Sequence, residues 1–202
     1  MLCVKLKKYD VNCAATTGGV SRLWIFDRDD FDFTQAAADA DGNKPVYTAI
    51  ARRTAAGATA EGGANLFPVL FQYKEASYSY TQSLNNGTSV KYEHNLEFLL
   101  SDISHFITQW NEAVDRASAC CGIGVIVELN SGKIIVMAEK YVNGSRIREW
   151  RMQQNGSTGT TGKLFEDANG QTTKLVGDFN RGAYEYSGGS AALEALEADD
   201  ES

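Results

Sequence analysis

The chain of 202 residues is poor in several residue types that mark common classes of protein. It has two prolines and two histidines, and no apolar run of about eighteen residues that could cross a membrane as a helix. The basic residues Lys5, Lys7 and Lys8 are not followed by an apolar stretch, so no signal peptide is expected. We therefore expect a protein that is cytosolic, or is built in a cytosol, and that does not insert into a membrane.

The four cysteines do not have the spacing of a metal site. Structural zinc sites take ligands in pairs that are two to four residues apart, whereas Cys120 and Cys121 are adjacent and Cys3 and Cys13 are isolated. Disulfides are not expected in a reducing compartment. The sequence predicts buried apolar thiols and no metal ion.

No arrangement of residues indicates catalysis. His105 lies three residues after Asp102, a spacing that can orient an imidazole on a helix, but no nucleophile or metal-ligand pattern accompanies it, and His94 stands alone. The glycine-rich run Gly156–Gly162 resembles a phosphate-binding loop, yet Leu164 stands where that motif needs serine or threonine. We predict no catalytic residues, no cofactor and no enzymatic activity.

The net charge of −7 is distributed unevenly. The last residues, Ser190–Ser202, carry five acidic and no basic side chains, which leaves 19 basic and 21 acidic residues in the rest of the chain. This predicts one domain over residues 1–189, followed by a flexible acidic tail over residues 190–202. A nearly neutral body without a basic stripe argues against tight binding to nucleic acid.

Nineteen glycines and many Thr, Tyr, Val and Ile residues favour β-structure. The apolar run Arg22–Asp27 predicts a buried strand. The following segment Thr34–Ala64 is rich in alanine, and we expect it to be a long irregular insertion that gains its order from another molecule. Within it, Val46–Arg53 could form a strand or one helical turn.

The strongest β pattern is a long hairpin. Its first arm is Val69–Leu84, its turn is Asn85-Asn86-Gly87, and its second arm is Thr88–Leu100. Apolar and polar side chains alternate along both arms, and the second arm places Tyr92 on the same face as its apolar residues. Arms this long would reach past one small core.

A helical period follows over Asp102–Ala119, with Ser101 or Asp102 as the expected N-cap. The remaining strands are predicted at Gly124–Asn130, Lys133–Tyr141, Arg146–Gln153, Lys163–Phe165 and Gln171–Phe179, with Gly156–Gly162 as a loop. The predicted fold class is α+β and mainly β: an antiparallel sandwich or barrel of about eight strands. One flanking amphipathic helix, the long hairpin and the long irregular insertion complete it.

This layout resembles the tail tube proteins of long-tailed bacteriophages and related injection machines. The resemblance rests on Leu66–Leu100, Asp102–Ala119 and the strands from Gly124 to Phe179. It implies a structural virion protein, assembled in the host cytoplasm, that forms stacked hexameric rings. Its partners would be copies of itself, other tail proteins, and DNA that passes without tight binding.

Physical reasoning agrees with that implication, because long exposed strands aggregate unless another strand covers them. We expect the hairpin to pair with the adjoining subunit and Thr34–Ala64 to order against the next ring. The residues predicted to take part in self-assembly are Tyr78, Tyr80, Asn85, Asn86, Gly87 and Tyr92.

Two alternatives remain open. The first is another virion component, such as a connector, a tail terminator or a decoration protein, which would form single rings rather than tubes. The second is a β-barrel that binds a small ligand or glycan in an aromatic pocket, and saturable binding by a monomer would favour it. Its candidate residues are Trp24, Trp110, Trp150, Tyr73, Tyr78, Tyr80 and Tyr92.

Overall fold

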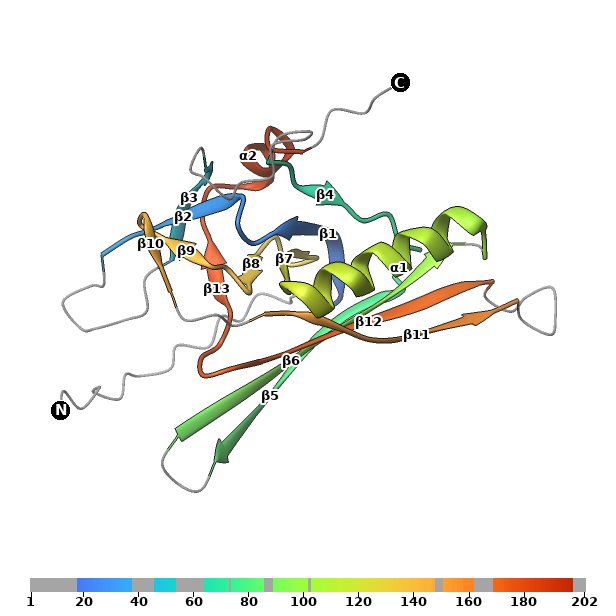
Figure 1. Cartoon of the computed structure of the whole chain (residues 1–202). Coiled ribbons are helices and arrows are strands. Elements are labelled where there is room, and N and C mark those ends of the chain that lie inside the picture. Colours follow the sequence, from blue (N-terminus) through green and yellow to red (C-terminus); the bar gives the residue numbers. More distant parts are fainter. Residues whose placement is uncertain are drawn as a thin grey trace.

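The computed structural model describes residues 18–37, 46–53, 64–72, 74–85, 89–101, 103–147, 151–161 and 169–197, which form two sheets and two helices (Figure 1). The nine-stranded sheet has the order β10 (Ser145–Arg146), β9 (Tyr141–Val142), β2 (Phe31–Gln35), β3 (Tyr47–Arg52), β13 (Tyr184–Tyr186), β8 (Ile134–Met137), β7 (Ile123–Leu129), β1 (Val20–Asp27) and β4 (Phe67–Pro68). The four-stranded sheet has the order β11 (Gln153–Thr160), β12 (Gly170–Phe179), β6 (Ser89–Ser101) and β5 (Ala76–Asn85). The helices are α1 (His105–Cys120) and α2 (Ser190–Glu194).

The predicted mainly β sandwich is confirmed. Apolar side chains from the two sheets meet in one core, to which β1 contributes Leu23 and Ile25 and β6 contributes Leu96 and Phe98. The pairs within the sheets are antiparallel except for β3 with β13 and β2 with β9. The described strands number more than the eight expected, because several have only two to five residues.

A second core lies on the other face of the nine-stranded sheet. Trp24 and Phe26 of β1, which alternate with Leu23 and Ile25, pack there with Ile126 of β7. A strand with both faces buried reads as a continuous apolar run, which explains why β1 was recognisable from the sequence. No helix in the described part of the chain is long and apolar enough to cross a membrane.

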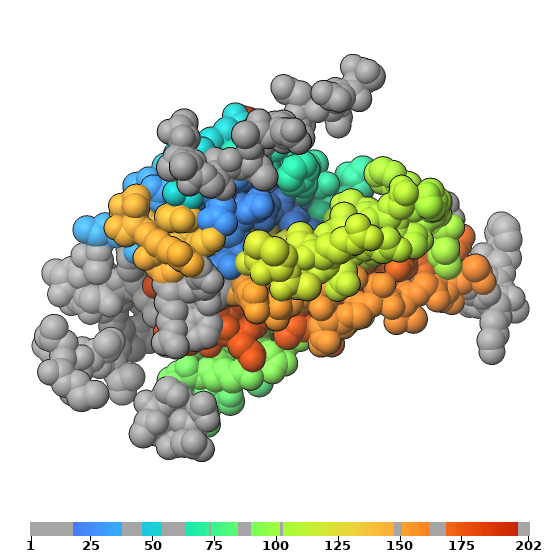
Figure 2. Space-filling model, viewed as in Figure 1, coloured from blue at the N-terminus to red at the C-terminus, as the bar shows by residue number. Residues whose placement is uncertain are grey.

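The helix α1 lies along the side of the sandwich, over β11 and β12 (Figure 2). It begins three residues later than Asp102, because Ser104 is the N-cap and its hydroxyl accepts a hydrogen bond from the Ile107 N–H. Its buried residues are Asn111, Val114 and Ser118. The predicted apolar stripe is therefore only partly covered, and Phe106 is 74% exposed.

The segment Thr34–Ala64 is only partly the irregular insertion that was expected. β3 occupies its middle and pairs with β2 from Phe31↔Arg52 to Gln35↔Tyr47, and Tyr47 is fully buried. These residues take their order from the chain itself rather than from another molecule. Positions 38–45 and 54–63 lie outside the described residues.

The flexible acidic tail predicted for residues 190–202 is wrong for residues 190–197. Leu193 in α2 is completely buried in the second core, and Leu196 packs against the same core. The Leu66 N–H donates to the Leu196 carbonyl at 2.8 Å, and the Trp24 Nε1–H donates to Glu197 at 2.7 Å. Two leucines in an acidic segment are enough to dock it, since the sheet supplies the receiving apolar surface. Residues 198–202 lie outside the described residues.

Three local predictions also need correction. Residues 156–160 of the glycine-rich run Gly156–Gly162, which was predicted as a loop, form most of β11, because β12 supplies their hydrogen-bonding partner; Gly162 lies outside the described residues. Val69 does not begin a strand, and the first hairpin arm starts only at Ala76. Cys120 and Cys121 are exposed at the end of α1 rather than buried.

Candidate self-assembly surface

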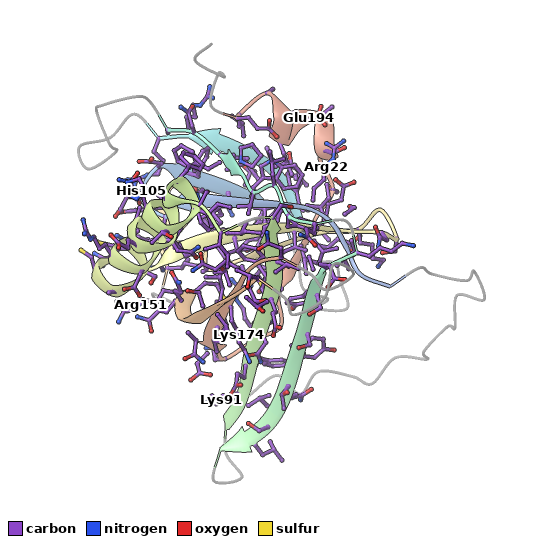
Figure 3. All side chains as sticks on the ribbon, turned by 90° about the vertical axis from the view of Figure 1, so that its right-hand side faces the viewer. Arg22, Lys91, His105, Arg151, Lys174 and Glu194 are labelled. Carbon is purple, nitrogen blue, oxygen red and sulfur yellow. The ribbon has the colours of Figure 1, made fainter. Side chains whose placement is uncertain are left out.

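The hairpin of β5 and β6 extends beyond the rest of the molecule (Figures 1 and 3). Its register runs without a shift from Ala76↔Phe98 to Asn85↔Ser89. The face that continues the core is buried at the base of the hairpin, where Leu96 and Phe98 have no exposed surface. Towards the tip the same face is open, since Tyr80 is 58% and Leu84 is 71% exposed. The hairpin thus presents large apolar side chains that its own core does not cover.

Three of the predicted assembly residues lie together on this face. The rings of Tyr80 and Tyr92 are 6.0 Å apart, and those of Tyr78 and His94 are 5.9 Å apart. His94 also lies 6.0 Å from Tyr80 and 6.3 Å from Tyr92, and Phe179 of β12 packs edge-on to it at 4.8 Å. This aromatic cluster stiffens the hairpin where it leaves the core.

His94 is the buried centre of that cluster. Its Nδ1 lies 2.7 Å from the Tyr78 hydroxyl, and its Nε2 lies 3.4 Å from the Arg181 carbonyl. A neutral imidazole with the proton on Nε2 satisfies both contacts, with Tyr78 as the donor to Nδ1. Burial accordingly lowers the pKa of His94 and raises the pKa of the Tyr78 hydroxyl.

The residue that accepts from His94 also anchors the hairpin to the larger sheet. The Arg181 guanidinium pairs with the buried carboxylate of Glu139 and lies 3.7 Å from the centre of the Tyr184 ring. The Tyr47 hydroxyl donates to Glu139 at 2.5 Å, and burial raises the pKa of that hydroxyl. A continuous chain of polar contacts therefore links β5 to β3 across the sandwich.

The variant in which asparagine replaces His94 is expected to lose less stability than the unaltered protein when the pH falls. Because burial lowers the folded-state pKa of His94, the unfolded chain takes up a proton first, near its ordinary pKa of about 6.5. The stability that the neutral imidazole contributes is present above that pH and is lost as the pH falls towards the folded-state pKa, by up to about 1.4 kcal/mol per pH unit.

The measurement is the free energy of unfolding by urea between pH 7 and pH 5. The variant His94→Asn should be less stable at pH 7 than the unaltered protein. Its free energy of unfolding should, however, fall less steeply as the pH decreases. His105 is exposed on α1, so His105→Asn is the matched control and should keep the full slope. Equal slopes in all three proteins would rule out a buried neutral His94.

The four-stranded sheet ends in two outer strands, β5 and β11. Among the described residues, no strand pairs with the outer edge of either one. The helix α1 covers the start of β11, where the Gln154 N–H donates to the Ser118 hydroxyl, but residues 155–160 are exposed. Unpaired edges of this kind are templates for another chain.

The face of this sheet that points away from the core is polar and is named the polar face below. Its charged groups nearly balance: Lys91 pairs with Asp178 at 3.0 Å, and Lys174 lies opposite Glu97 in the register (Figure 3 labels both lysines). The polar face carries Ser77, Ser79, Thr81, Ser83, Lys91, Glu93, Asn95, Glu97, Thr172, Lys174 and Asp178, and β11 adds Gln153 and Thr158. The same register places two apolar residues on this face, Val176 and the buried Leu99.

Of the other predicted assembly residues, Asn85 ends β5, and Asn86 and Gly87 lie outside the described residues. The sequence analysis did not include Leu84 or His94 among the assembly residues. Leu84 is in phase with Tyr78 and Tyr80, so the alternation could have identified it. The role of His94 depends on Arg181, which is 87 positions away, and no local pattern indicates that.

Comparison of the chain with protein-family models, with curated proteins and with solved structures found no match.

Proposed function

We propose that the protein is a structural subunit that joins copies of itself into closed rings, which stack to form the tail tube of a bacteriophage. The observation that carries this proposal is the four-stranded sheet, whose outer strands β5 and β11 pair with no further strand in the described part of the chain. Because the two edges differ, β5 of one copy would contact β11 of the next, which is a head-to-tail contact. Such a contact builds a closed ring when the rotations from copy to copy add up to a full turn.

The strand directions fit such a contact. Each neighbouring pair in the sheet, β5 with β6, β6 with β12 and β12 with β11, is antiparallel. In a sheet of four strands the two outer strands consequently run in opposite directions. A rotation about the ring axis preserves strand direction along that axis, so β5 of one copy would meet β11 of the next as an antiparallel pair. The joined sheets would form one uniform antiparallel barrel.

The position of the body decides which face lines the channel. The nine-stranded sheet and α1 both pack on the core side of the four-stranded sheet. Since the outside of a ring has more room than the inside, this bulk belongs on the outside and the polar face belongs on the inside. The polar face has two basic and three acidic side chains, and such a surface neither holds nor strongly repels DNA phosphates.

The size is compatible with a hexamer. Six copies of the four-stranded sheet would give a barrel of about 24 strands, wider than the roughly 16- to 18-stranded porins that hold an aqueous channel. At about 4.8 Å between strands, its backbone diameter would be roughly 37 Å or more, which leaves room for a DNA duplex. The exposed apolar face of the hairpin tip would contact the body of a neighbouring subunit.

Negative-stain electron microscopy of the purified protein, over a range of concentrations, tests the proposal. Open-ended tubes of stacked rings with a central channel are expected. Single rings that never stack would support ring formation, but they would indicate another virion component instead of a tail tube. A monomer at all concentrations, in particular one that binds a small ligand saturably, would contradict the proposal.

A further inference from the structure

Two exposed cysteines meet at the end of α1. The Sγ atoms of Cys120 and Cys121 lie 2.9 Å apart, and both residues are exposed. No other cysteine belongs to the described residues, because Cys3 and Cys13 lie outside them. Two thiols in contact on one surface form a chelating pair, which is chemically distinct from a single thiol.

The backbone around the pair is held in place. The Cys121 N–H donates to the carbonyls of Ala117 and Ser118 and so closes the helix. The Cys121 carbonyl accepts a hydrogen bond at 3.0 Å from Arg28, whose side chain is buried and also donates to the Ala138 carbonyl at 2.7 Å. This backbone holds the two Cα atoms in place, so less conformational freedom is lost when a ligand bridges the two sulfur atoms.

An apolar groove of about 390 Å³ leads to the two thiols. One wall is the face of α1 that carries Trp110, Ala113 and Ala117, and the other wall is formed by β1 and β4, including Phe67. Phe67 is 51% exposed, so the groove is open to solvent. A ligand that reaches the thiols can therefore place an apolar substituent in the groove.

We propose that Cys120 and Cys121 form a bidentate binding site for trivalent organic arsenicals, with the organic group lying in the groove beside Trp110 and Phe67. Trivalent arsenic is pyramidal, and its two bonds to sulfur meet near a right angle, which suits sulfur atoms in contact. This site goes beyond the proposed ring assembly and does not depend on it.

The reaction is a condensation without oxidation or reduction. An arsenical R–As=O and two thiols give R–As(SR')₂ and water: two As–S bonds form, the As–O bonds break, and both thiol protons leave with the oxygen. Arsenic remains trivalent throughout. The pKa of the Cys121 thiol is raised, chiefly by its hydrogen bond with Cys120, so this thiol keeps its proton at neutral pH and is a weak target for alkylating reagents.

Titration of the full chain with phenylarsine oxide tests the site. One equivalent should remove two thiols and add one phenylarsenic group in place of two protons, as measured by a thiol reagent and by intact mass. The single variants Cys120→Ser and Cys121→Ser should each bind at least about a hundredfold more weakly, because chelation is lost. The matched control is the double variant Cys3→Ser/Cys13→Ser, which keeps both described thiols and should bind like the unaltered protein.

The groove is tested by comparing phenylarsine oxide with methylarsine oxide. The ratio of the affinity for phenylarsine oxide to that for methylarsine oxide should be about tenfold higher for the protein than for a small dithiol, because the groove buries part of the phenyl ring. Tight binding that survives Cys120→Ser or Cys121→Ser, or that disappears in the Cys3→Ser/Cys13→Ser control, would overturn the site. Equal relative affinities would overturn the role of the groove. Thermal unfolding of each variant verifies that the chain is folded.

Discussion

Replacing Tyr80 and Leu84 together with lysine is expected to yield a folded subunit that no longer assembles. Both side chains are more than half exposed, on the face of the hairpin that continues the core beyond the body. Covering a large apolar side chain stabilises a contact by about 1.5–3 kcal/mol, and an unpaired lysine in its place adds a cost of desolvation. The double variant should therefore weaken assembly by more than about a hundredfold at each contact. The measurement is the fraction of protein in rings or tubes, by sedimentation and electron microscopy.

The matched control is Ser79→Lys/Ser83→Lys. It introduces the same two lysines into the same strand, but on the polar face. Its folding, charge and position along β5 match the first variant, so it should assemble while the first variant does not. Normal assembly of Tyr80→Lys/Leu84→Lys would show that the hairpin face is not a contact. Failure of both variants with intact folding would point to strand β5 itself rather than to one of its faces.

Deleting residues 190–202 is expected to unfold the protein. Loss of a buried leucine such as Leu193 costs about 2–5 kcal/mol, and the hydrogen bonds from Leu66 to Leu196 and from Trp24 to Glu197 add about 0.5–1.5 kcal/mol each. The ion pair of Arg22 with Glu194, visible in Figure 3, is exposed and adds little. The total is a large part of the 5–15 kcal/mol that typically stabilises a domain.

The matched control deletes only residues 198–202. It removes three of the five acidic side chains of this segment while keeping Leu193 and Glu197, so its melting temperature should not change. The milder variant Leu193→Ala should remain folded and lose about 3 kcal/mol in urea unfolding. A chain shortened at residue 190 that melts like the full protein would show that α2 contributes nothing to the fold.

The elements that the sequence predicted correctly are those whose own residues follow one clear periodic pattern. The alternation along β6, the apolar run of β1 and the helical period of α1 all appear in the structure, because each has many residues with one dominant period. Helix α2 has five residues and no such period, and it is ordered because Leu193 enters a core built elsewhere in the chain. Strand β11 is likewise polar and glycine-containing, and β12 makes it a strand.

The candidate self-assembly surface also has a part that local patterns predict and a part that they do not. That Tyr78, Tyr80 and Tyr92 share a face follows from their alternation, once the register of the hairpin is known. That β5 and β11 are the outer strands of the described sheet could not be predicted, because the order of strands depends on pairing between β6 and β12, whose residues lie about 70 to 90 positions apart. The polar face follows from that same pairing.

The contact between Trp24 and Glu197 spans 173 positions of the chain. A nascent chain still attached to the ribosome cannot make this contact until Glu197 has emerged, so the second core cannot be completed before that point. Pairing over such separations also slows folding. If copies assemble as proposed, a chain without its complete second core would be slow to join its neighbours, which would limit premature joining of partly synthesised copies on a polysome.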